Sequence, residues 1–265
     1  MTREIQLLGR LFIGMALLGC LSATGLLVNQ PVQAATGNQQ AFVSSPSTGP
    51  SVGMTVDTVW AKLLEHNRRR EARLQQASYS APRTYRVKDD KGKVRAEARV
   101  LMQYRAPGTK EFKLVSKTGS DLIYGRVLKP LMESEAEAAS GRHRQDSALT
   151  PANYTFDLLG EENLDGQRCF LVQATPKRAD KYLFNGKIWI HTSEFAVVKI
   201  AGQPAKNPSF LIKRVNFVRR YQKVGEFWLP LKDESVTQVR FAGTNILTVG
   251  YDHYELAQLA VAGKK

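Results

Sequence analysis

The sequence predicts a mainly β protein of the α+β class, in which one strongly curved antiparallel sheet, or incomplete β-barrel, carries helices on its concave side. From residue 84 onward, apolar and polar residues mostly alternate, a period of two that is typical of strands with one buried face. Short turn signals between consecutive strands imply antiparallel pairing. Several strands span about 12–15 residues, and such a long twisted sheet must curl or close to cover its apolar face.

The N-terminus has the anatomy of an export signal. Residues 1–10 carry two arginines and one acid, and residues 11–28 are uncharged and mostly apolar. Small residues follow, ending at Ala34 and Ala35. This order predicts a signal peptide over 1–34, cleavage between the two alanines, and export to the periplasm.

Two alternatives to cleavage stay open. The segment Leu17-Leu18-Gly19-Cys20 loosely resembles a lipobox, which would make Cys20 a lipidated N-terminus. The apolar run over 11–28 is 18 residues long and can just span a bilayer as an uncleaved anchor. Either alternative would tether the protein to the outer or the inner membrane.

The rest of the chain divides into a flexible linker over 35–54, one domain over 55–258 and a tail over 259–265. Apolar residues at i, i+3, i+4, i+7 and i+8 predict an amphipathic helix at the start of the domain. Thr55 or Asp57 can cap this helix. The apolar stripe consists of Val56, Val59, Trp60, Leu63 and Leu64.

A basic run follows this stripe, and it has two interpretations. Arginines at 68, 69, 70 and 73 form either a solvated helix face, which also suits the helix dipole, or a patch that faces lipid or a partner.

About ten strands and two helical segments make up the domain. The clearest strand is 94–105, where Val94 and alternate residues up to Tyr104 point one way and the charged residues point the other. A turn over 89–93 precedes it, and a strand over 110–117 follows. Turn signals, among them those at 184–186 and 202–204, separate the later strands. The later strands are predicted over about 153–160, 167–175, 186–192, 195–202, 209–223, 226–240 and 244–255.

Residues 119–139 form the second helical segment and the candidate lid. Its apolar residues have helical spacing, and a proline should kink it or split it in two. The candidate lid residues are Leu122, Val127, Pro130 and Leu131.

The charge balance indicates anionic partners outside the cytoplasm. The chain has 38 Lys+Arg and 24 Asp+Glu, a net charge of +14. Without residues 1–34 it keeps 36 bases and 23 acids, or +13. Because an exported protein does not meet nucleic acid, we expect none as a partner. An anionic membrane surface or an acidic patch of an envelope protein suits this charge.

Catalytic motifs are missing from the sequence. The histidines at 66, 143, 191 and 253 lack zinc-site spacing, and no nucleophile elbow, phosphate-binding loop or dinucleotide fingerprint is present. The pair Glu161-Glu162 precedes a turn, which favours a solvated hairpin end. Cys169 lies among apolar neighbours, so we interpret it as a buried thiol. We expect no catalytic residue, no metal and no cofactor; a triad assembled from distant strands stays an alternative.

Three segments resemble bacterial outer-membrane lipoprotein-sorting proteins, which are related to the periplasmic lipoprotein carrier. They lie at 150–160, 175–190 and 225–230, and the most specific parts are Gly-Lys-Ile-Trp-Ile and Phe-Trp-Leu-Pro. The resemblance implies an incomplete barrel whose helices lid a hydrophobic cavity. It also implies a carrier that shields acyl chains and lacks catalytic residues and cofactors.

On this basis the expected function is binding of lipoprotein acyl chains or other lipid, by a monomer, for sorting towards the outer membrane. A periplasmic sensor or interaction module on the same fold is the alternative. Periodicity does not distinguish a filled interior from a hollow one. The candidate cavity-lining residues are Val100, Met102, Tyr104, Phe112, Leu114, Phe156, Leu158, Ile188, Ile190, Val198, Phe217, Phe227 and Leu229.

Overall fold

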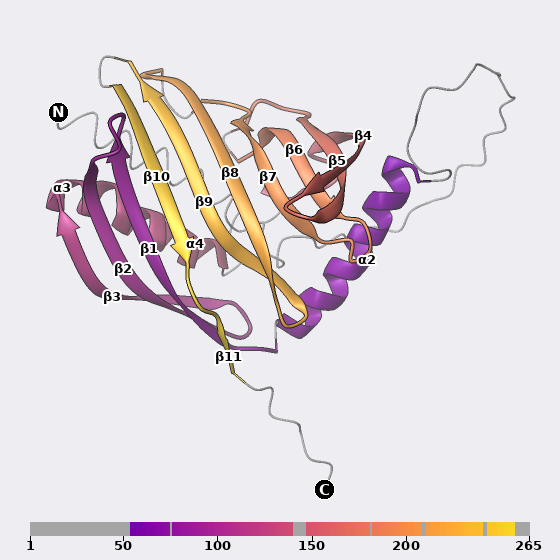
Figure 1. The fold of residues 1–265 in the computed structure, drawn as a ribbon, viewed down its shortest axis with the longest axis horizontal. Helices are drawn as coiled ribbons and strands as arrows, with labels where there is room; N and C mark the ends of the chain where they lie inside the picture. Colours follow the sequence, from indigo (N-terminus) through magenta and orange to yellow (C-terminus); the bar gives the residue numbers. More distant parts are fainter. Residues whose placement is uncertain are drawn as a thin grey trace, which may run out of the picture.

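The computed structural model describes one continuous antiparallel sheet with its helices (Figure 1). The predicted signal peptide, its cleavage site at Ala34–Ala35, nearly all of the linker and the tail lie outside the described residues. No helix of the described part is long and apolar enough to cross a membrane. The structure describes residues 54–74, 76–139, 147–180, 182–207, 210–240 and 243–257.

The sheet has eleven strands, and every neighbouring pair is antiparallel. Ten of them follow the order β3-β2-β1-β10-β9-β8-β7-β6-β5-β4, and the short β11 also pairs with β1. Among the described residues the end strands β3 and β4 do not pair, so the sheet is open. The strands are β1 Tyr79–Asp89, β2 Val94–Arg105, β3 Thr109–Gly119, β4 Tyr154–Leu164, β5 Gln167–Pro176, β6 Phe184–His191, β7 Val197–Pro204, β8 Ile212–Val224, β9 Phe227–Val239, β10 Gly243–Tyr251 and β11 Glu255–Leu256.

The first strand begins five residues earlier than predicted, at Tyr79 rather than at residue 84. Pro82 lies inside it, although proline lacks the N–H that a central strand needs. β1 pairs with β10 only from Arg83 onward and with β11 only up to Ser80. Pro82 therefore lies at the gap between these two partners, where its carbonyl accepts from the Asp252 N–H at 3.1 Å.

Two glycine signals that predicted turns lie inside strands instead. Gly186 belongs to β6 and Gly202 to β7, and the two residues are direct cross-strand partners. A Cβ on Gly186 would lie 2.2 Å from the Ala201 carbonyl oxygen. These glycines allow a close backbone approach between strands, which the sequence pattern does not distinguish from a turn.

The predicted turn over 89–93 is confirmed. Val94, which follows the turn, does not lie on the buried face of β2 that we predicted for it. Ala96 to Tyr104 bury alternate side chains as predicted, whereas Val94 is exposed. A register shift separates the pairs Val87–Ala96 and Lys88–Val94. This irregularity turns Val94 to the charged face of β2.

Two helical units cover the sheet. α2 (Val56–Leu74) begins at Thr55, whose Oγ1 accepts from the Thr58 N–H at 3.2 Å, as the capping prediction requires. The second unit runs without interruption through α3 (Asp121–Ile123), the π-helical η1 (Tyr124–Leu128) and α4 (Lys129–Ala139). Pro130, in the first turn of α4, does not split the segment, because a π-helical turn directly precedes it.

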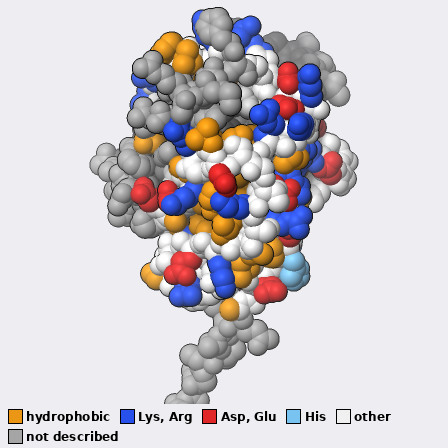
Figure 2. All heavy atoms as spheres, turned by 90° about the vertical axis from the view of Figure 1, so that its left-hand side faces the viewer, with side chains coloured by type: hydrophobic (Ala, Val, Ile, Leu, Met, Phe, Trp, Pro, Cys, Tyr) orange, Lys and Arg blue, Asp and Glu red, His pale blue; other side chains and the backbone are white. Residues whose placement is uncertain are grey.

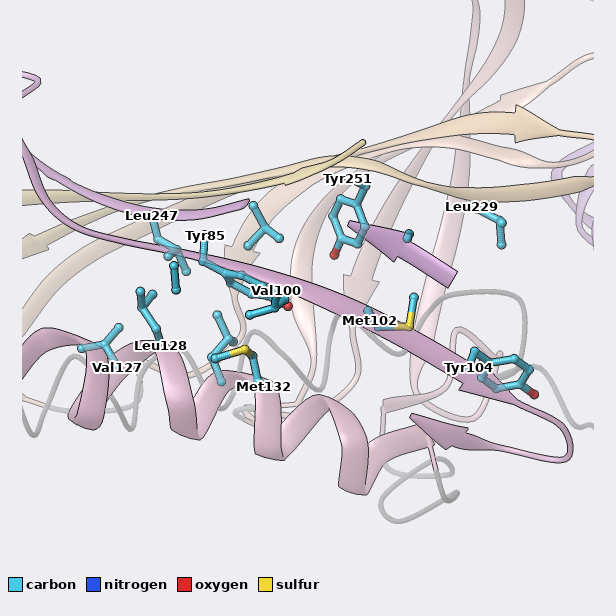
Figure 3. Packing of buried hydrophobic residues seen from close by; sticks show 14 of the residues in the cluster. Tyr85, Val100, Met102, Tyr104, Val127, Leu128, Met132, Leu229, Leu247 and Tyr251 are labelled. Atoms are coloured by element: carbon cyan, nitrogen blue, oxygen red, sulfur yellow. The ribbon is translucent and has the colours of Figure 1, made fainter. Parts of the chain in front are cut away.

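Both helical units lie on one face of the sheet, which we call the inner face. Alternate strand residues on this face form two hydrophobic clusters. The α4 cluster joins the second helical unit to β1, β2 and β8–β10, and Figure 3 shows Val127, Leu128 and Met132 pointing towards Tyr85 and Leu247. The α2 cluster joins α2 to β4–β8 and to Trp228 of β9.

Candidate functional site

The thirteen candidate cavity residues do not come together in one place. Nine have buried side chains, and the set is divided between the two clusters. Leu114 belongs to neither cluster and is exposed. The α4 cluster holds Val100, Met102, Tyr104, Phe227 and Leu229, with Phe112 at its edge. The α2 cluster holds Ile188, Ile190, Val198 and Phe217, with Phe156 and Leu158 at its edge.

A groove of about 260 Å³ remains between β2–β3 and the helical unit η1–α4. Its lining includes three of the candidate residues and is mostly apolar. Figure 2 views the molecule from the side of β3 and α3 and shows hydrophobic side chains at the surface among charged ones. We call this site the β3–α4 groove. It is lined by Val100, Lys110, Phe112, Leu114, Tyr124, Lys129, Met132, Glu133 and Ala136.

The candidate lid residues lie on the helical unit that forms one wall of this groove. Val127 and Leu131 are buried in the α4 cluster, Pro130 is half-buried and Leu122 is exposed. The segment therefore packs on the inner face of the sheet.

A buried ion pair connects this lid segment to the sheet. Arg83 of β1 donates from Nη1 to both carboxylate oxygens of Glu135 on α4, at 2.8 and 2.9 Å. Lys110 of β3 donates to the same carboxylate at 3.0 Å. Burial opposes the ionisation of Glu135, but the two cations outweigh it and lower the pKa of Glu135 to about 2.

The polar contacts continue across the inner face towards β8. The Arg83 guanidinium lies 4.5 Å from the ring centroid of Tyr251, whose hydroxyl donates to Asp233 at 2.8 Å. Arg219 of β8 donates from Nε to Asp233 at 2.6 Å. Arg219 pairs across the strands with Ile200, a member of the α2 cluster. We call this chain of charges, from Lys110 to Arg219, the inner-face ion network.

The sequence analysis missed this network, although the alternation pattern holds a signal for it. Arg83 stands in phase with the buried Tyr85 and Val87 of β1, and Asp233 stands in phase with the buried Ser235 of β9. A charged residue in the apolar phase of a strand indicates a buried charge with a partner. Because the first strand was predicted to start after Arg83, that residue was not assigned to a face.

Two buried hydroxyl groups lie on the same face without a hydrogen-bond partner in the described structure. They are Ser235 Oγ and Thr237 Oγ1 on β9. Together with the ion network, they make the middle of the inner face more polar than the sequence predicted.

The basic run on α2 anchors the helix to the sheet. Arg70 donates from Nη1 to the Phe195 carbonyl at 3.2 Å and from Nη2 to the Glu194 carbonyl, both in the β6–β7 turn. Arg73 pairs with Glu226 in the β8–β9 turn. Burial lowers the pKa of Arg70. Arg68, Arg69 and Arg73 are exposed, as the solvated-face interpretation predicts, and Arg73 lies in the last turn of α2. Arg70 is half-buried and binds within the chain, which neither interpretation predicted.

The candidate catalytic residues are dispersed. Among the described residues, no group of three or more His, Cys, Asp or Glu could hold a metal ion. His191 Nδ1 accepts the backbone N–H groups of Ser193 and Glu194, both at 3.3 Å, so it caps a turn. The Glu161–Glu162 pair is exposed, as predicted.

Cys169 is buried, as predicted. Burial, together with the nearby Glu162 carboxylate, raises the pKa of its thiol to about 11. A thiol with so high a pKa is a poor nucleophile at neutral pH.

Comparisons with known proteins return the expected resemblance at low identity. A model of a family described as an uncharacterized protein matches residues 144–248. No curated protein matches the chain.

Several solved structures are similar to it. A DUF1329 family protein from Desulfovibrio piger has 14% identity and a TM-score of 0.38, over 78% of this chain and 95% of that chain. A candidate outer membrane lipoprotein-sorting protein domain from Vibrio parahaemolyticus has 12% identity and a TM-score of 0.38 over the same shares. A LolA superfamily protein from Nitrosomonas europaea has 13% identity and a TM-score of 0.36, over 78% and 96%. At these values the similarity does not by itself assign a function to this chain.

Proposed function

We propose that this protein is a periplasmic carrier that shields an acyl chain of a lipid or lipoprotein, and that the chain enters the β3–α4 groove. The observation that carries this proposal is the groove itself, since apolar side chains line it and it opens to solvent. The sequence resemblance to lipoprotein-sorting proteins supplies the ligand class. The predicted signal peptide supplies the compartment.

The size of the groove limits what it holds in the described conformation. Ligand pockets for drug-sized molecules commonly measure about 300–1,000 Å³, and the groove measures about 260 Å³. A short segment of one acyl chain fits such a volume. Each methylene buried contributes about 0.8 kcal/mol, so a few of them give modest affinity after ordering costs.

Movement of the helical unit away from the sheet would enlarge the groove. Such an opening would extend the groove from Val100, which already lines it, to Met102, the next inner-face residue of β2; Figure 3 shows both side chains beside the helix. The lidded cavity that we expected would correspond to this opened form. The strong curvature that we expected is not found in the described structure, where the sheet is open and not strongly curled. The Arg83–Glu135 pair must break or move with the helix in that transition.

The lipid content of the purified protein tests the proposal. The protein is purified under native conditions from cells that export it, extracted with organic solvent and analysed by mass spectrometry for acyl lipid. Competition with a fluorescent fatty acid then measures binding. Co-purified acyl lipid and saturable competition are expected. Absence of both would contradict the carrier function.

A second function is favoured by one observation. Most of the candidate cavity residues are packed in two clusters, as they would be in a sensor or interaction module. That function predicts a stable complex with an envelope protein and no lipid transfer to vesicles. Size-exclusion chromatography with light scattering checks the expected monomer in both cases.

A further inference from the structure

We propose that one end of the sheet docks on an anionic lipid bilayer, with Phe210 in the membrane interface. This end consists of the beginning of β8, the end of β9 and the β1–β2 hairpin, and we call it the docking end. It lies at the upper left of the sheet in Figure 1. The inference is independent of the acyl-chain groove and goes beyond the carrier function.

Phe210 is the most exposed large hydrophobic residue of the described structure, with 83% of its surface accessible. It directly precedes Leu211, whose carbonyl accepts the Arg240 N–H at 2.8 Å. An aromatic ring this exposed gains free energy when it enters an apolar or interfacial environment. A single exposed residue is common on protein surfaces, so the surroundings of Phe210 decide its meaning.

A second exposed apolar residue lies at the same end. Val94, with 43% of its surface accessible, pairs with Lys88 at the beginning of the β1–β2 hairpin. Lys88 pairs in turn with Ile246 of β10, and Ile246 with Val236 of β9. The ladder therefore connects the hairpin to the strand ends that flank Phe210.

The side chains around Phe210 are basic. Lys213, Arg214 and Arg240 are all exposed. The sequence contains no Asp or Glu from residue 195 to residue 225, nor from 235 to 251. The hairpin adds acids at 89 and 90, but it also carries several lysines. An exposed aromatic residue with exposed basic residues near it in the sequence and at the end of the paired strand β9 matches the interface of an anionic bilayer, where cations meet lipid phosphates and the ring reaches the acyl boundary.

Leu159 is also an exposed apolar residue, but it lacks the basic neighbours that Phe210 has. Its side chain, on the edge strand β4, has 52% of its surface accessible. Its neighbours Asp157, Glu161 and Glu162 are acidic. An anionic bilayer would repel this region, so Leu159 serves as a matched control for Phe210.

A tryptophan reporter tests the proposal in the full chain. The native tryptophans, Trp60, Trp189 and Trp228, are buried and should respond little to vesicles. In Phe210→Trp, added phosphatidylglycerol vesicles should shift the emission to the blue, and brominated acyl chains should quench it. The Leu159→Trp variant, which carries the same N-terminal segment, should show neither effect.

The role of the basic residues near Phe210 is tested in the Phe210→Trp variant. Each Lys or Arg near an anionic surface strengthens binding by about fivefold. Adding Arg214→Gln and Arg240→Gln to Phe210→Trp should therefore weaken vesicle binding by at least tenfold, and 0.5 M salt should do the same. Phosphatidylcholine vesicles should give little shift. The proposal is overturned if the two reporters respond alike, if neither responds, or if binding does not depend on lipid charge.

Discussion

Arg83 and Glu135 are 52 residues apart in the sequence, yet the Arg83 Nη1 lies 2.8 and 2.9 Å from the two carboxylate oxygens of Glu135. Both side chains are buried. This contact joins the first strand of the sheet to the helical unit that covers the inner face. The position of the proposed lid therefore depends on a charge pair as well as on apolar packing.

Replacing Glu135 by glutamine should strongly destabilise the fold. The variant removes the carboxylate that neutralises the buried Arg83 guanidinium, and breaking a buried pair in this way costs about 3–5 kcal/mol. Arg83→Met should cost less, because Lys110 still neutralises the carboxylate. Urea unfolding followed by fluorescence measures both. Equal stability of Glu135→Gln and the wild type would contradict a buried ion pair.

The double variant Arg83→Met/Glu135→Leu distinguishes charge from packing. Because it removes both charges at once, its loss of stability should be smaller than the sum of the losses from Arg83→Met and Glu135→Leu measured singly, by at least about 1 kcal/mol. Additive losses would show that the two side chains do not interact.

The pH dependence of stability follows from the same carboxylate. The pKa of Glu135 is depressed from 4.5 to about 2, so its contribution is fully present above pH 4.5. It is lost progressively as the pH falls towards 2, and amounts to about 3 kcal/mol. Urea titrations at pH 6, 4 and 2.5 measure the free energy of unfolding. This free energy should fall more steeply with decreasing pH for the wild type than for Arg83→Met/Glu135→Leu. Parallel declines would contradict the assignment.

The anchor of α2 can be removed separately. Arg70→Ala loses its bonds to the Phe195 and Glu194 carbonyls, which should cost about 1–3 kcal/mol and raise hydrogen exchange in the β6–β7 turn. Arg68→Ala is the control, since Arg68 is exposed and should change stability by less than about 0.5 kcal/mol. A similar effect of both substitutions would contradict the anchoring role.

Cys169 should be unreactive in the folded protein. Its thiol is buried and its pKa is raised to about 11. In a Cys20→Ser background, a thiol reagent at pH 8 should label nothing until urea unfolds the chain, and then label one cysteine. Rapid labelling before unfolding would show that the thiol is accessible.

Much of the sheet was predictable because its evidence is local. The alternation in β2 gave the buried face from Ala96 to Tyr104, and the stripe on α2 gave its buried side. The errors arose where a residue type has two structural uses. Gly186 and Gly202 favour turns in sequence, but here they allow two strands to approach closely.

The site was less predictable, because it depends on pairing between distant strands. Whether Met102 faces a cavity or a packed helix is decided by Met132 and its neighbours on α4, which periodicity does not place. The ion pair of Arg83 with Glu135 likewise needs the tertiary structure. The groove-lining residues Tyr124, Met132 and Ala136 were not among the candidates for the same reason.

The most direct test of the carrier function fills the groove. Ala136 lines it, whereas Val115 lies on the same edge strand as Phe112 and Leu114 but is exposed and outside the lining. Ala136→Phe should lower the affinity for a fluorescent fatty acid at least tenfold, while Val115→Phe should leave it unchanged, with urea unfolding confirming that both variants fold. Unchanged binding by a folded Ala136→Phe would contradict the proposal that the acyl chain enters the β3–α4 groove.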